Sequence, residues 1–134
     1  MYGQEGRGVL IPPCKPLFAD QEFCDRTGWD GHYARDAEWK NDSLVSSCID
    51  EAKSAILEKT QGGLTGRAIY MMHFDAEGKV DFVCYQNQLH PYITYKMNGC
   101  LRLPEFSNPD STGRGMPGWL PYPIYFNWNW DVEN

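Results

Sequence analysis

Hydrophobic positions after Asp42 recur at the spacing of one face of a helix. The steps between them are three and four residues, which predicts a helix over about 43–60. The positions are Val45, Cys48, Ile49, Ala52 and Ile56. Asp42 has a side chain that can cap the helix start, and Gly62-Gly63 favours the left-handed backbone that ends a helix. The pattern therefore predicts an amphipathic helix with one buried face.

The next two segments, 67–74 and 79–86, alternate between apolar and polar residues, as strands with one buried face do. The predicted inward residues are Ala68, Tyr70, Met72 and Phe74, then Val80, Phe82 and Cys84. Asp75-Ala76-Glu77-Gly78 fits a type I turn that closes on a glycine. We expect an antiparallel hairpin with one buried face. This alternation places His73 and Cys84 on different faces of the hairpin, which argues against a Cys–His nucleophilic pair.

A second helix and an aromatic strand follow. His90-Pro91 fits a helix start, and Pro104 should end that helix. Its apolar stripe is Leu89, Ile93, Met97, Cys100 and Leu101. Residues 105–121 are rich in Pro, Gly, Ser and Asn, so they predict a long excursion. The last strand should run from Tyr122 to Trp130, with Ile124, Phe126 and Trp128 in the core.

Residues 1–41 show no sustained period and are punctuated by Gly, Pro and Trp. We expect an irregular arm over 1–41, wrapped on the body, and one α+β domain over 42–134. In that domain a short antiparallel sheet, made of the hairpin and the C-terminal strand, packs against two helices. With 134 residues, of which 42% are hydrophobic, the chain can bury one core.

Charge and motifs exclude several function classes. A net charge of −6 disfavours nucleic acid and anionic lipid as partners. The chain has no apolar run long enough for a membrane span, and its first ten residues lack the pattern of a signal peptide. It also lacks the nucleophile elbow, phosphate-binding loop, dinucleotide fingerprint and zinc-protease motif. We therefore expect a non-enzymatic protein without a metal or cofactor.

Five cysteines in so short a chain favour an oxidising compartment. The missing export signal then implies a mature form or an excised domain; five reduced thiols in the cytosol are the alternative. Cys48 and Cys100 lie on the apolar faces of two helices that pack on the same side of the hairpin, so we predict a disulfide between them rather than two buried thiols. Cys14 and Cys24 should pair within the arm, which leaves Cys84 free in the core.

Acidic and aromatic side chains indicate an alternative function. Asp20, Glu22 and Asp25 cluster in the arm, with Asp30 and Asp36 beyond them, either as a solvated surface or as the acids of a hydrolytic site. With the aromatic strand they would form the cleft of a small secreted hydrolase or inhibitor. Asn41-Asp42-Ser43 fits a glycosylation acceptor, although Asp42 as a helix cap explains it without glycan.

The element order helix, hairpin, helix, long connection and final strand resembles the C-terminal domain of TonB-like envelope proteins. It is most similar to the cysteine-bearing AgmX/PglI type of adventurous gliding motility proteins. The residues that carry the likeness cover about 80 positions. They are Cys48, the 66–74 strand, the Asp75–Val80 turn, Cys100, Leu103-Pro104 and Pro123-Ile124-Tyr125-Phe126. The arm, a membrane anchor and a Pro-rich spacer fall outside the likeness.

The resemblance implies a periplasmic or exported module that binds another protein of the cell envelope within a larger assembly. TonB-like domains take an extended partner segment at the edge of the final strand. Pro123 suits such an outer strand because its missing N–H can face away from the sheet. The expected partner-binding residues are Tyr125, Asn127, Asn129 and Trp130.

Overall fold

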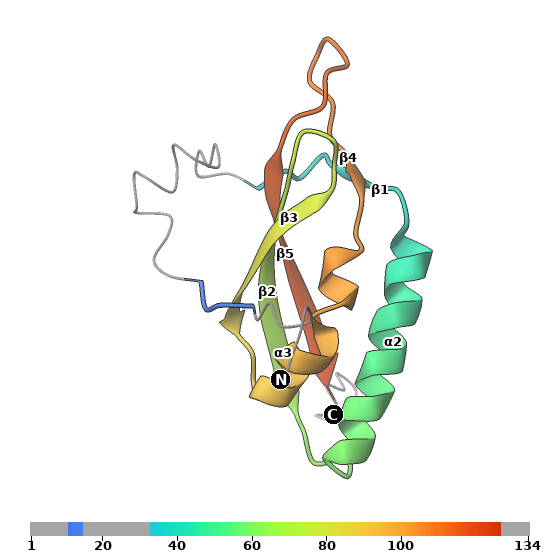
Figure 1. Ribbon diagram of the computed structural model, residues 1–134, viewed down its shortest axis with the longest axis vertical. Helices are drawn as coiled ribbons and strands as arrows, with labels where there is room; N and C mark the ends of the chain where they lie inside the picture. The colour runs from blue at the N-terminus through green and yellow to red at the C-terminus, as the bar shows by residue number, and fades with distance from the viewer. Residues whose placement is uncertain (1–10, 15–32, 127–134) are drawn as a thin grey trace, which may run out of the picture.

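The structure, a computed structural model, describes residues 11–14 and 33–126 (Figure 1). Strands β2 (Gly66–Phe74), β3 (Val80–Asn87) and β5 (Gly118–Phe126) form an antiparallel sheet in the order β3-β2-β5. Helices α2 (Asp42–Lys59) and α3 (Pro91–Met97) and the short 3₁₀ helix η3 (Cys100–Arg102) pack on one face of it. Two short strands, β1 (Glu38–Trp39) and β4 (Phe106–Ser107), pair separately. The predicted α+β class is confirmed.

Helix α2 forms where the apolar spacing predicts it and buries Val45, Ile49, Ala52 and Ile56. Its cap differs from the prediction, because Asp42 is the first helical residue and Asn41 is the N-cap. The Asn41 amide nitrogen donates to the Leu103 carbonyl at 2.8 Å, and its oxygen accepts from the Glu105 N–H at 3.0 Å. Both amide atoms thus tie the start of α2 to the chain after η3. The asparagine of the glycosylation motif is engaged in this structural role.

The β2–β3 hairpin closes through the predicted turn. Gly78 has a φ of 86°, and Asp75 accepts hydrogen bonds from the Glu77 and Lys79 N–H groups at 2.9 and 3.0 Å. The ladder is interrupted: Phe74 pairs with Val80 and His73 pairs with Phe82, so Asp81 is an extra residue. This bulge reverses the alternation along β3. Val80 and Val83 face the helices, whereas Phe82 and Cys84 face away, so the predicted shared face of Val80, Phe82 and Cys84 is wrong.

Both faces of the sheet are buried, not one as predicted. The helical face forms the main core, in which the largest fully buried side chains are Tyr70, Phe74, Phe106, Phe126 and Ile56. On the opposite face Met71, Cys84 and Trp119 are also buried, and Cys14 and Tyr33 pack against them. These last two residues belong to the arm. The alternation of the hairpin alone could not reveal a layer that is contributed by a distant, earlier segment of the chain.

The second helical segment is shorter than its apolar stripe. His90 is the N-cap of α3, and its Nδ1 accepts from the Tyr92 N–H at 3.1 Å. The helix ends at Met97, and η3 then carries Cys100 and Leu101 into the core. Ile93 and Met97 are buried as predicted. Within the described residues, no helix has the length and apolar character that crossing a membrane requires.

Strand β5 begins at Gly118, before the predicted start at Tyr122. The excursion that precedes it contains β4 and a narrow loop, in which Pro109 and Gly115 form a bridge. Asp110 holds the tip of this loop, since its carboxylate accepts from the N–H groups of Thr112 at 2.8 Å and Arg114 at 2.9 Å. Figure 1 shows the loop projecting beyond the end of the sheet. Ile124 and Phe126 are buried as predicted, whereas Trp128 lies outside the described residues.

Candidate functional site

The outer edge of β5 is defined by which of its main-chain groups point away from β2. The Ala34 N–H donates to the Trp119 carbonyl at 2.9 Å, so the Trp119 main chain faces outward. In an antiparallel strand the main-chain groups alternate in direction from one residue to the next. The register of β5 on β2 is unbroken from Gly118 to Phe126. Residues 121, 123 and 125 therefore also direct their main chain outward.

Two of those outward positions are proline. Pro121 and Pro123 have no N–H, so they contribute only carbonyl groups to the outer edge. This agrees with the predicted role of Pro123 in an outer strand. Prolines at alternate edge positions also hinder uncontrolled pairing with other chains. After Trp119, Tyr125 is the first outward position on β5 that carries an N–H.

Tyr125 is the one predicted partner-binding residue that the structure describes. Tyr125 is 36% exposed, while its neighbours Ile124 and Phe126 are buried. Asn127, Asn129 and Trp130 lie outside the described residues. The Tyr125 side chain shares a face with Trp119, which is buried at the other end of β5. This face is thus closed near Trp119 and exposed near Tyr125.

The outer edge of β3 pairs at Tyr85 with an earlier segment of the same chain. The Tyr85 N–H donates to the Pro12 carbonyl at 3.0 Å, and the Cys14 N–H donates to the Tyr85 carbonyl at 2.8 Å. Pro13 and Tyr85 form a parallel bridge. We call residues 11–14 the strap. Its first residue, Ile11, is 3% exposed and belongs to the main core.

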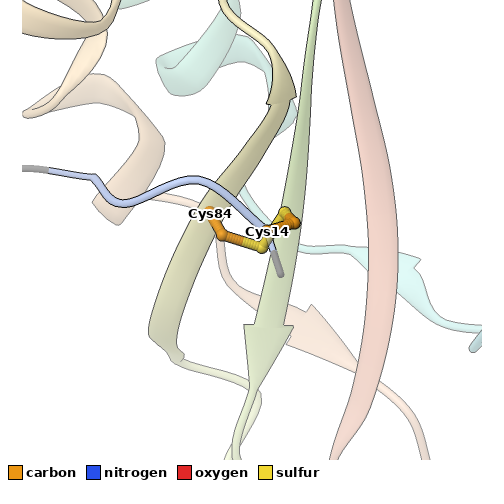
Figure 2. The surroundings of a disulfide bond; sticks show 2 residues. All are labelled: Cys14 and Cys84. Atoms are coloured by element: carbon orange, nitrogen blue, oxygen red, sulfur yellow. A yellow bond between two sulfur atoms is a disulfide. The ribbon is translucent and has the colours of Figure 1, made fainter. Parts of the chain in front are cut away.

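A disulfide fastens the strap. Figure 2 shows Cys14 on the strap linked to Cys84 on β3, and the two Cα atoms are 4.9 Å apart. The predicted Cys14–Cys24 pairing and the free Cys84 are therefore wrong. The bulge at Asp81 turns Cys84 to the face that the strap covers, where Cys14 meets it. Cys24 lies outside the described residues.

The second predicted disulfide is present. Cys48 of α2 and Cys100 of η3 are joined, with 5.6 Å between their Cα atoms. This bridge holds the helical layer together above the sheet. Two disulfides in one small chain are typical of proteins that fold in an oxidising compartment, which agrees with the expected export.

His73 lies on the same face as Cys84, contrary to the prediction. Its Nδ1 is 2.6 Å from the Asp81 carboxylate, and its ring is 5.0 Å from the Trp119 ring. The His73 residue is only 6% exposed. Because Cys84 is consumed in a disulfide, it is not a nucleophile in this structure. The bulge residue Asp81 thus serves to pair with His73 at the sheet surface.

A buried polar chain joins the sheet to α3. The Tyr70 hydroxyl is 3.0 Å from the Thr94 hydroxyl, which in turn donates to the Gln88 side-chain oxygen at 2.5 Å. Burial raises the pKa of Tyr70 to about 12, although the hydrogen bond with Thr94 works in the opposite direction. The phenol therefore stays protonated while it is inside the fold.

This shift predicts a loss of stability at high pH. An unfolded tyrosine has a pKa near 10, so between about pH 10 and pH 12 the folded chain binds the Tyr70 proton more tightly than the unfolded chain does. The stabilisation is complete below pH 10 and is lost as the pH rises through 12, and the loss amounts to roughly 3 kcal/mol. Urea unfolding across this range should show the loss, and Tyr70→Phe should reduce it, leaving a contribution from Tyr122, whose pKa is also raised by burial. An equal slope in both proteins would contradict this assignment.

Most of the acidic residues of the alternative hydrolase or inhibitor cleft lie outside the described residues. Asp20, Glu22, Asp25 and Asp30 lie outside the described residues, and Asp36 is exposed. In the part of the chain that is described, no three His, Cys, Asp or Glu side chains gather as a metal site would require. Trp119 is buried in the second core and Tyr122 is half-buried against the main core.

Comparisons with known proteins return no relative. No protein-family model matches the chain, and neither a curated protein nor a solved structure does.

Proposed function

We propose that this chain is a non-enzymatic protein-binding module that takes an extended segment of its partner along the outer edge of β5. The observation that carries the proposal is the difference between the two edges of the sheet. The strap pairs with β3 at Tyr85 and is fixed there by Cys14–Cys84, whereas on the outer edge of β5 Ala34 pairs with Trp119, at the end of the strand away from Tyr125. Edge strands add partner strands through their main chain.

The prolines define where such a segment pairs. Pro121 and Pro123 contribute no donors, so among the described residues the proposed docking row begins at Tyr125. Asn127, Asn129 and Trp130, which lie outside the described residues, are proposed as further partner contacts. Tyr125 is 36% exposed, and its side chain combines apolar area with a hydroxyl group, a combination that suits a protein interface. A partner segment with an apolar residue opposite Tyr125 fits this end of the strand.

We further propose that the chain is a TonB-like domain of the AgmX/PglI type, working in the periplasm or outside the cell on an envelope assembly. Support comes from the order α2-β2-β3-α3-β5 and from the disulfide between the two helical segments. The two disulfides are compatible with that compartment. The strap and its disulfide to β3 lie outside the likeness on which this assignment rests.

Replacing Tyr125 by proline tests the docking row. The substitution removes an outward N–H and leaves the inward bonds of β5 to β2, so the fold should persist while partner affinity falls at least about tenfold. Tyr125→Val is the matched control, because it also removes the ring but keeps the N–H and suits a strand. The measurement is the dissociation constant of the partner purified on the wild-type protein. Equal affinities for the proline and valine variants would refute main-chain docking at Tyr125.

A further inference from the structure

The strap makes contacts that do not depend on its belonging to the same chain. Ile11 enters the main core, Pro12 and Cys14 exchange hydrogen bonds with Tyr85, and Cys14 is bonded to Cys84. The hydrogen bonds and the disulfide join residues far apart along the sequence, since Cys14 and Cys84 are 70 positions apart. The edge of β3 therefore acts as a peptide-binding edge, and the strap is the peptide that fills it in the monomer.

We propose that this edge also accepts the strap of a second copy of the chain, which gives a strand-exchanged dimer joined by two Cys14–Cys84 disulfides. Each copy would donate its strap and accept the other, so the assembly closes with two-fold symmetry and Tyr85 of each copy is paired with a strap. Every contact of the strap described above is formed again in the dimer. This interaction concerns the edge of β3 and is independent of partner binding on β5.

The length of the intervening chain permits the exchange. Residues 15–32 separate the strap from the next described residue, Tyr33. Eighteen residues reach at most about 60 Å when extended, compared with a radius of gyration of roughly 14 Å for a chain of this size. The connection is therefore long enough for the strap to reach the β3 edge of a neighbouring copy.

The protein concentration determines whether the monomer or the strand-exchanged dimer forms. Because the strap contacts are the same in both, the monomer is favoured only by the effective concentration of its own strap, which for a linker is on the order of millimolar. The outcome is then fixed when the disulfide forms. Each Cys14–Cys84 bond oxidises two thiols, and the two electrons and two protons pass to a small disulfide such as oxidised glutathione, which becomes two thiols.

Two complementary variants test the exchange. One copy carries Cys14→Ser and keeps Cys84, and the other carries Cys84→Ser and keeps Cys14; both also carry Cys24→Ser. Neither copy can form the Cys14–Cys84 bond alone. Mixed in a glutathione redox buffer, the pair should give a covalent heterodimer in which peptide mapping finds Cys14 of one copy linked to Cys84 of the other. Its yield should rise with protein concentration.

The control removes the buried anchor of the donated strap. Ile11→Asp in the copy that keeps Cys14 should lower the heterodimer yield at least about tenfold, because a carboxylate is costly to bury at the Ile11 position. Mapping of the Cys48–Cys100 link in every sample checks that each copy has folded. A mixture that stays monomeric while this link is intact would overturn the proposal. A heterodimer yield unaffected by Ile11→Asp would overturn it too, because the thiols would then be pairing by collision.

Discussion

Replacing Gly78 by alanine should lower the free energy of unfolding by about 3 kcal/mol or more. Gly78 has a φ of 86°, which disfavours any side chain. A Cβ there would lie 1.9 Å from the carbonyl oxygen of Phe106, a main-chain atom of β4. That main chain cannot move aside easily, because the Phe106 N–H donates to the Gly78 carbonyl at 2.9 Å and β4 pairs with β1. The substitution should separate the hairpin turn from β4.

Gly113→Ala separates the contribution of backbone strain from that of the steric contact with β4. Gly113 has a similar φ of 89°, but no atom lies within 4 Å of a Cβ placed there. Only the backbone strain remains, so the cost should be about 1 kcal/mol. Urea denaturation of the two variants and the wild type measures both values. Equal losses at Gly78 and Gly113 would mean that the close approach of β4 to the turn contributes nothing.

Removing the Cys48–Cys100 disulfide should lower the free energy of unfolding by about 4 kcal/mol. The bond closes a sequence separation of 52 residues, and its loss frees the unfolded chain far more than the folded one. Cys48→Ala with Cys100→Ala tests this, since both side chains lie against the core and alanine keeps the sites apolar. Denaturation under non-reducing conditions supplies the values. A loss under about 1 kcal/mol would show that the bond adds little to the helical layer.

The local elements were predictable from the sequence because their signals lie within short windows. The three- and four-residue steps between Val45, Ile49, Ala52 and Ile56 are sufficient to predict α2, and the turn ending at Gly78 is sufficient to predict the hairpin. The Cys48–Cys100 disulfide is predictable as well, because both cysteines lie in helical segments whose buried faces the apolar spacing identifies. Each of these inferences needed only the period of one segment and the position of its apolar side.

The predictions for the face of Cys84 and for the start of β5 are wrong because single residues change the geometry of these strands. Asp81 as a bulge moves Cys84 to the opposite face, and no feature of the sequence marks it as an extra residue. The alternation of residues along β3 therefore does not identify Cys84 as the disulfide partner of Cys14. Pro121 made the start of β5 look like a loop, although proline is compatible with an edge strand when its nitrogen faces outward.

The position of the partner on the protein is the most direct test of the proposed binding edge. A photoreactive phenylalanine derivative can be placed at position 125 on β5, or at position 95 on α3, where Tyr95 is 67% exposed. Irradiation of the protein in its native assembly then links it to whatever touches that position. We predict a covalent partner adduct from position 125 and none from position 95. An adduct from position 95 with none from position 125 would contradict the account and move the interface from the sheet edge to α3.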